Sequence, residues 1–207
     1  MSADAIELRV LGCLLEKQRT TPDAYPLSLN SLRLACNQST NREPVVDYDE
    51  RTIRAALDRL AQKGWTRLAS GAGSRTVKFR HLFDEALKVS DEEIAVLCVL
   101  MLRGPQTPGE LKQRTPRLHD FASLDEIERV LDDLIARELV ARLPRRPGQK
   151  EQRYGQLLGD ESAEPAPAEP APERVDRLAE IERQLQDLRD EVVALRAELA
   201  RSNTHPG

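Results

Sequence analysis

An internal repeat is the feature that most constrains how this 207-residue chain can fold. The segment at 9–17 (RVLGCLLEK) resembles that at 95–103 (AVLCVLMLR), and the segment at 50–65 (ERTIRAALDRLAQKGW) resembles that at 124–139 (LDEIERVLDDLIAREL). In the longer pair, apolar residues recur at i, i+4 and i+7, the spacing of a helix that buries one face. The matching residues are Ile53, Leu57 and Leu60 in the first copy and Ile127, Leu131 and Leu134 in the second.

Each copy also contains signals for a short middle helix and a β-hairpin. The middle helices are predicted at 27–36 and 108–114, and the second of them begins with the capping pattern Thr-Pro-x-Glu. After the last helix of each copy, at 65–81 and 139–156, two short strand-forming runs flank a turn that contains Gly or Pro. This arrangement is typical of a hairpin.

The order helix, helix, helix, strand, strand, written twice, is that of a winged helix-turn-helix. The sequence therefore predicts a mainly α protein with small β-hairpin wings (α+β). It would consist of winged-helix domain 1 at 1–89, winged-helix domain 2 at 90–159, a Pro/Ala/Glu-rich disordered linker at 160–172 and a coiled-coil helix at 173–202.

The predicted coiled coil has a narrow apolar stripe that repeats every seven residues. Such a stripe favours pairing between chains, with folding back onto its own domain as the alternative, and it leaves the oligomer order open. The predicted oligomerisation residues are Leu178, Ile181, Leu185, Leu188, Val192, Leu195 and Leu199.

The charge is unevenly distributed along the chain. Residues 1–89 carry 14 Lys and Arg against 11 Asp and Glu, residues 90–159 carry 11 against 12, and residues 160–207 carry 6 against 12. The mildly basic first part permits a nucleic-acid partner, and the acidity lies in the C-terminal segment.

Cysteine usage and hydropathy predict a cytoplasmic protein with no membrane partner. Cys13, Cys36 and Cys98 are far apart and odd in number, so a disulfide framework is not expected. The longest apolar run, at 94–102, is about half the length of a membrane span.

Three strings in this chain resemble the YceH-like family of uncharacterised bacterial proteins. They are RVLGCLLEKQRTTPDAYPLSLNSLRLACNQSTNREPV, RGPQTPGELKQRT and LPRRPGQKEQRYGQLLG, and the resemblance spans roughly residues 5–159. It implies a cytosolic protein with two winged-helix domains, often followed by a coiled-coil tail. It implies no activity and no active-site residues.

The residues that could carry catalysis or bind a metal are scattered. His81, His119 and His205 fall in a predicted strand, a loop and the tail, and none has a metal-ligand spacing with the cysteines. No phosphate-binding glycine loop or nucleophile-elbow motif is present in the sequence. We therefore expect no enzymatic activity, no metal and no small-molecule cofactor. His81 is expected to be a half-buried ring with its polar atoms satisfied.

DNA binding is the function that the sequence favours. The expected partners are double-stranded DNA and other copies of the same chain. The face of the third helix opposite its apolar stripe carries basic side chains and a glutamine, which contact phosphates and base edges. The predicted nucleic-acid-binding residues are Arg51, Arg54, Arg59, Gln62, Lys63, Arg75, Lys78, Arg80, Arg145, Arg146 and Lys150. The protein would then be an oligomeric regulatory or nucleoid-associated protein.

The corresponding helix of the second copy is acidic, which gives an alternative function. Asp125, Glu128, Asp132 and Asp133 would oppose phosphates. This face favours a protein–protein scaffold or adaptor with no direct DNA binding, and domain 2 would contact the protein partner.

A polar loop, ACNQSTNREP at 35–44, precedes the third helix of the first copy. It expands the turn of the helix-turn-helix to about a dozen residues. Asn37 is predicted as a left-handed helix cap, and Cys36 as a core residue. A loop contact surface is hypothesised at Asn37, Gln38, Asn41 and Arg42.

Overall fold

A computed structural model of the chain describes residues 2–69, 76–145 and 151–159. These residues belong to one compact unit. The predicted linker at 160–172, the coiled-coil helix at 173–202 and the seven oligomerisation residues in that helix lie outside the described residues.

The first half of the described chain, residues 2–89, is mainly helical with one small antiparallel sheet. Its elements are α1 (Ala5–Thr20), the 3-10 helix η1 (Pro22–Ala24), β1 (Leu27–Ser28), α2 (Leu29–Cys36), α3 (Glu50–Gln62), β2 (Thr66–Leu68), β3 (Lys78–His81) and α4 (Phe83–Leu87).

The second half, residues 90–159, repeats the order of three helices followed by a hairpin. Its elements are α5 (Asp91–Arg103), α6 (Pro108–Arg114), α7 (Leu124–Ala136), β4 (Val140–Leu143) and β5 (Arg153–Gln156). The coarse prediction of a mainly α protein with small antiparallel sheets is confirmed.

Besides the short 3-10 helix η1, two elements of the first half were not predicted. Residues 27 and 28 form strand β1 rather than the start of the middle helix, and Leu27 pairs with Phe79 so that the sheet order is β1–β3–β2. In the second half Gln106 occupies the corresponding place, as an isolated bridge to Tyr154 on β5. Helix α4 is the other addition. Both features depend on contacts between residues far apart in the sequence, which local patterns do not report.

Side-chain caps mark the starts of α3, α5 and α6, and the capping pattern predicted for α6 is confirmed. Asp49 accepts a hydrogen bond from the backbone N–H of Thr52 at the start of α3. Full capping boxes begin α5, at Ser90 with Glu93, and α6, at Thr107 with Glu110. These bonds satisfy backbone donors that the first turn of a helix leaves free.

The third helices of the two halves also end alike. The residues that follow them, Gly64 and Glu138, both have positive φ, 74° and 55°. In each case the next residue donates its N–H back to a leucine carbonyl near the helix end, Trp65 to Leu60 and Leu139 to Leu134. This is the hydrogen-bond pattern of a left-handed helix C-terminus, so the repeat extends to backbone conformation.

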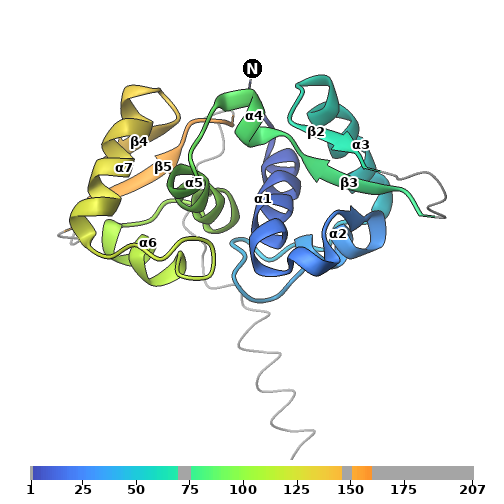
Figure 1. The fold of residues 1–207 in the computed structure, drawn as a ribbon, viewed down its shortest axis with the longest axis horizontal. Coiled ribbons are helices and arrows are strands. Elements are labelled where there is room, and N and C mark those ends of the chain that lie inside the picture. The colour runs from blue at the N-terminus through green and yellow to red at the C-terminus, as the bar shows by residue number, and fades with distance from the viewer. Residues whose placement is uncertain (1, 70–75, 146–150, 160–207) are drawn as a thin grey trace, which may run out of the picture. The chain divides into compact units, whose positions relative to one another are not determined.

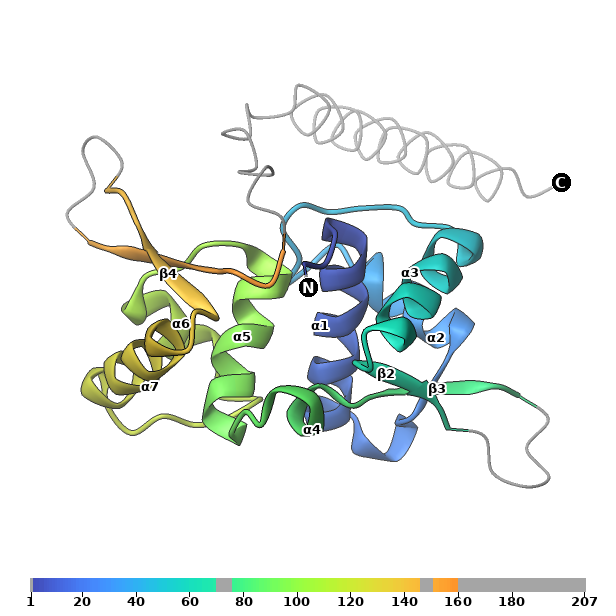
Figure 2. The same ribbon diagram turned by 90° about the horizontal axis from the view of Figure 1, so that it is seen from above.

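Helices α1 and α5 lie side by side at the centre of the compact unit (Figures 1 and 2). Residues 7–15 of α1 and 93–102 of α5 are all buried, because each helix is covered by its own half on one side and by the other half on the other. A helix buried on all sides is apolar all round rather than amphipathic. This position accounts for the long apolar run at 94–102.

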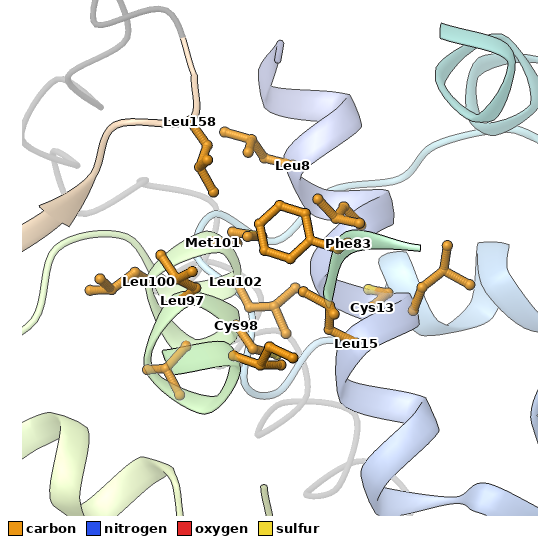
Figure 3. Close-up of a cluster of buried hydrophobic side chains, with 14 of the residues drawn as sticks. Leu8, Cys13, Leu15, Phe83, Leu97, Cys98, Leu100, Met101, Leu102 and Leu158 are labelled. Carbon is orange, nitrogen blue, oxygen red and sulfur yellow. The ribbon is translucent and has the colours of Figure 1, made fainter. Parts of the chain in front are cut away.

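One continuous core joins the two halves. Phe83 of α4 is fully buried between α1 and α5, near Leu8 and Met101 (Figure 3), and packs edge-on against Trp65 with ring centroids 5.5 Å apart. The two central helices approach closely at Gly12, whose carbonyl accepts a hydrogen bond from the Cys98 thiol.

Candidate nucleic-acid interface

Helix α3 presents an exposed polar stripe on the side opposite the core. Its buried side chains are Ile53, Ala56, Leu57 and Leu60. The exposed stripe consists of Arg51, Arg54, Asp58 and Gln62, at i, i+3, i+7 and i+11. In the described part of the chain, no carboxylate lies within ion-pair distance of Arg51 or Arg54. These two guanidinium groups are therefore available to an external anion.

Arg59 and Lys63, also predicted to contact DNA, have partners within the protein. Lys63 Nζ lies 2.7 Å from a carboxylate oxygen of Glu7, and Arg59 lies 2.7 Å from Asp4 and 3.7 Å from Glu7. Glu7 is buried, so these cations compensate a carboxylate that has lost its water. The structure gives both side chains a role in holding α3 against α1.

The hairpin β2–β3 adds cations beside α3. Arg67 on β2 stands directly opposite Arg80 on β3, and Lys78 lies two residues from Arg80 on the same face. Like charges opposite each other are unfavourable unless an anion lies between them. Arg80 is partly neutralised by Glu85, 2.8 Å away. Sequence reasoning missed Arg67, which only the strand register identifies, and the predicted Arg75 lies outside the described residues.

Helix α7 presents carboxylates where α3 presents arginines. Asp125, Glu128, Asp132 and Asp133 are all exposed. A shallow groove between α7 and the β4–β5 hairpin includes Glu128 and Asp132, and Arg142 of β4 forms an ion pair with Asp132 across it. Arg145 is exposed, whereas Arg146 and Lys150 lie outside the described residues. Helices α3 and α7 stand at opposite ends of the compact unit (Figures 1 and 2).

The hypothesised contact surface in the loop between α2 and α3 needs correction, because Arg42 is buried and Gln38 bonds to it within the protein. The Arg42 side chain is fully buried. Its guanidinium donates to both carboxylate oxygens of Glu16, at 3.0 and 2.6 Å, to the Ala35 and Asn41 carbonyls and to Gln38 Oε1. The Gln38 side chain is engaged in the same network. A group enclosed in this way is not part of a surface.

The two asparagines of this loop also have internal partners. Asn37 Nδ2 donates to the Tyr48 carbonyl and Asn37 Oδ1 accepts from the Tyr48 N–H, each at 2.9 Å. Asn37 has φ of −92°, so the predicted left-handed cap was wrong; the left-handed residue is Asn41, at 60°. The Asn41 side chain accepts from Arg103 at the end of α5. The loop thus connects the first half to the second.

A second buried arginine supports the same loop. Arg9 of α1 donates to the Cys36 carbonyl at 3.1 Å and to the Pro44 carbonyl at 2.6 Å. The Glu43 N–H donates to the Leu102 carbonyl of α5 at 2.8 Å. Carbonyls that a loop would otherwise leave without partners are satisfied by these groups.

The three cysteines are buried, which confirms the prediction that Cys36 is a core residue. The Cys13 thiol and burial raise the pKa of the Cys36 thiol, and burial raises the pKa of Cys98. Both effects favour the neutral thiol at Cys36 and Cys98, whereas nucleophilic and metal-binding cysteines act as thiolates. At Cys13 burial acts in the same direction, but the hydrogen bond with Cys36 and the charge of Arg42 outweigh it and lower the pKa.

His81 is more deeply buried than predicted, with 2% of its surface exposed. Its ring contacts the side-chain oxygen of Gln18 through Nε2. Nδ1 lies 3.4 Å from Asp84 but makes no hydrogen bond, so the expectation that both ring nitrogens are satisfied was wrong. Burial lowers the pKa of this ring below the ordinary 6.5, and the nearby Asp84 carboxylate opposes the effect only in part. The folded protein therefore disfavours the imidazolium.

This burial predicts a loss of stability on mild acidification. As the pH falls below 6.5, His81 becomes protonated in the unfolded chain but stays neutral in the folded protein. Proton binding therefore stabilises the unfolded state, and the free energy of unfolding decreases until the pH passes the lowered pKa of the folded state. Urea unfolding midpoints measured between pH 7.5 and 5 should fall, and His81→Gln should flatten that fall. His205→Gln serves as the control and should retain that fall. An equal slope in wild type and His81→Gln would contradict the assignment.

One group within the described ranges combines a histidine with carboxylates at ligand spacing. The side-chain ligand atoms of Glu92, His119 and Glu126 all lie within 4.8 Å of one another. Sequence reasoning expected no metal and missed this group, because its members come from three segments with no characteristic spacing.

No described helix is both long and apolar enough to cross a membrane.

Comparison with known proteins links this chain to one bacterial family. Residues 3–149 match the family described as "Protein of unknown function, DUF480". The chain is 51% identical over 191 residues to a UPF0502 protein of Opitutus terrae, covering 89% of this chain and 82% of that protein. It is 48% identical over 202 residues to a UPF0502 protein of Serratia proteamaculans, covering 92% and 94%, and 54% identical over 160 residues to one of Citrifermentans bemidjiense, covering 76% and 74%.

Proposed function

We propose that this chain, which belongs to the DUF480 family, is a non-enzymatic, oligomeric DNA-binding protein built from two winged helix-turn-helix repeats. The repeated order of three helices and a hairpin supports this proposal, as does the shared conformation at the ends of α3 and α7. Because a fold alone does not establish a function, the proposal rests on the side chains that the fold exposes.

The observation that carries the proposal is the pair of arginines on α3, Arg51 and Arg54. Both are exposed on one stripe together with Gln62, and neither has a carboxylate within ion-pair distance among the described residues. The third helix of a helix-turn-helix enters the major groove, where arginine and glutamine side chains reach phosphates and base edges. Arg67 and Lys78 on the adjacent hairpin would contact the flanking backbone.

The second half plays a different role in this proposal. The exposed carboxylates of α7 would repel phosphates, and α7 stands at the far end of the unit from α3 (Figure 2). One duplex would therefore be held by the first half of each chain. Self-association through the predicted helix at 173–202 would bring a second first half to a neighbouring site on the DNA.

We expect the full-length protein to bind duplex DNA at low salt with an affinity that falls steeply as salt increases. Replacing both Arg51 and Arg54 by alanine should weaken binding roughly ten- to hundredfold and reduce the slope of log affinity against log salt by about 2, because two phosphate contacts are lost. Fluorescence anisotropy with a labelled duplex, titrated at several salt concentrations, measures both quantities.

A matched control removes the same charge from the other half. Arg117 and Arg129 are exposed residues of the second half, and their double replacement by alanine should leave DNA binding nearly unchanged. Equal losses in the two double variants would mean that only net charge matters. Absence of binding by the wild-type protein at low salt would reject the proposal.

The alternative is a protein–protein scaffold with no direct DNA binding. The exposed carboxylates of α7, among them Asp125 and Asp133, specifically favour it, because they would dock a basic segment of a partner. Two results together would favour this alternative. The wild-type protein would bind no duplex at low salt, and a defined partner protein recovered with it would be lost in the Asp133→Lys variant.

A further inference from the structure

Three segments converge on one small polar site in the second half. Glu92 belongs to the first turn of α5, Glu126 to the first turn of α7, and His119 to the loop that joins α6 to α7. Their ligand atoms all lie within 4.8 Å of one another, and His119 Nε2 is 4.0 Å from Glu92 Oε1. All three residues are half-buried, so the site is shielded by protein while remaining open to solvent.

The loop holds these side chains in place. The backbone N–H of Ala122 donates to Glu126 Oε2 at 2.8 Å, and Lys112 Nζ donates to the Ala122 carbonyl at 3.0 Å. The His119 ring packs edge-on against Phe121, with centroids 4.6 Å apart, and its backbone N–H donates to the Thr115 carbonyl. Outer contacts of this kind fix the orientation of ligands before a metal binds.

The charge at this site differs from that around three other buried or half-buried glutamates. Glu7, Glu16 and Glu93 each lie within 4.0 Å of an arginine or lysine nitrogen. In the described part of the chain no such nitrogen lies within that distance of Glu92 or Glu126. Two adjacent carboxylates and an imidazole without a protein cation form a set of donors that a divalent cation would neutralise.

From this arrangement we infer that Glu92, His119 and Glu126 form a binding site for a divalent transition metal of the Zn²⁺ class. One imidazole nitrogen and two carboxylate oxygens are ligands that Zn²⁺ accepts, with water completing the coordination. Bonds of about 2.0–2.1 Å place tetrahedral ligands roughly 3.3 Å apart, so side-chain rotations that bring the donors about 1.5 Å closer suffice. The bound ion joins the loop before α7 to the starts of α5 and α7 and stiffens the second half.

The test uses the full-length chain without a polyhistidine tag and ZnCl₂ as the probe. Equilibrium dialysis should show one bound Zn²⁺ per chain, and the melting temperature should rise by about 5–10 °C when free Zn²⁺ is one hundred times its Kd. Glu92→Gln and Glu126→Gln keep the size of the side chain, and the amide oxygen that the second substitution introduces can still accept from the Ala122 N–H. Each should weaken Zn²⁺ binding at least tenfold while folding normally.

The matched controls are Asp125→Asn and Glu128→Gln, which remove a neighbouring exposed carboxylate that lies outside the cluster. Both should bind Zn²⁺ as the wild type does. Acidic first-turn residues also stabilise helices without any ion; in that case the melting temperature is independent of Zn²⁺ and dialysis finds none bound, which overturns the inference. Equal weakening in controls and cluster variants, a sign of diffuse charge attraction, overturns it as well.

Discussion

Arg42→Ala should destabilise the protein by about 3–5 kcal/mol, the typical effect of removing one partner from a buried ion pair. The substitution leaves the half-buried carboxylate of Glu16 without its main cation and removes the donors to the Ala35 and Asn41 carbonyls. Burial alone would raise the pKa of Glu16, but the hydrogen bonds and charge of Arg42 outweigh it and lower that pKa. Urea or guanidinium denaturation followed by circular dichroism measures the loss.

Two further variants separate the buried network from the loss of a positive charge. Arg117 is exposed, so Arg117→Ala should change stability by less than about 0.5 kcal/mol. Arg42→Lys retains the charge but cannot supply all the hydrogen bonds of the guanidinium, and should fall between wild type and Arg42→Ala. A loss below about 1 kcal/mol for Arg42→Ala would show that the loop does not depend on this network.

Gly12→Val should be the second most damaging change, at about 2–3 kcal/mol. A Cβ atom built at Gly12 would lie 2.9 Å from Leu102 Cδ2 and 3.3 Å from Met101 Cβ, both on α5. Because α1 and α5 carry the contact between the two halves, the added methyl groups would force the central helices apart. The shift of the denaturation midpoint, with near-ultraviolet circular dichroism for the packing around Trp65, reports the effect.

Gly109→Ala provides the matched control on another helix. A Cβ there meets only Thr107 Oγ1, at 3.9 Å, so the substitution should be neutral or stabilising by up to about 1 kcal/mol through helix propensity. If Gly12→Val is as well tolerated as Gly109→Ala, then the close approach of α1 and α5 is not a requirement of the fold.

The sequence predicted local structure well because the signals for it are local. Helix α6 has the predicted bounds and begins with the predicted capping pattern at Thr107 and Glu110. Strand β1 could not be predicted, because two residues form a strand only through Phe79 and Lys78, about fifty positions later. The buried position of Arg42 in the loop could not be predicted either, because an arginine looks the same in sequence whether it contacts an external partner or the Glu16 carboxylate on α1.

In the candidate nucleic-acid interface, too, local patterns predicted which helix face is exposed but not which side chains pair with distant residues. Helical periodicity correctly placed Arg51 and Arg54 on the exposed side of α3. It also placed Arg59 and Lys63 near that side. Their acidic partners, at the N-cap and in the first turn of α1, are more than fifty residues away, and no local pattern predicts such a pairing. For the same reason, the sequence did not predict that Glu92, His119 and Glu126 lie together, since each comes from a different segment.

The contact between α1 and α5 resembles the interface of a symmetric dimer whose two subunits have been joined in one chain. Each half contributes its first helix, and the third helices stand at opposite ends (Figures 1 and 2). Such an interface forms at any protein concentration, since its partners cannot diffuse apart. In a homodimer every substitution appears twice, whereas here each half changes alone. Covalent joining therefore allows α3, the third helix of the first half, to carry basic side chains while α7, the third helix of the second half, carries acidic ones.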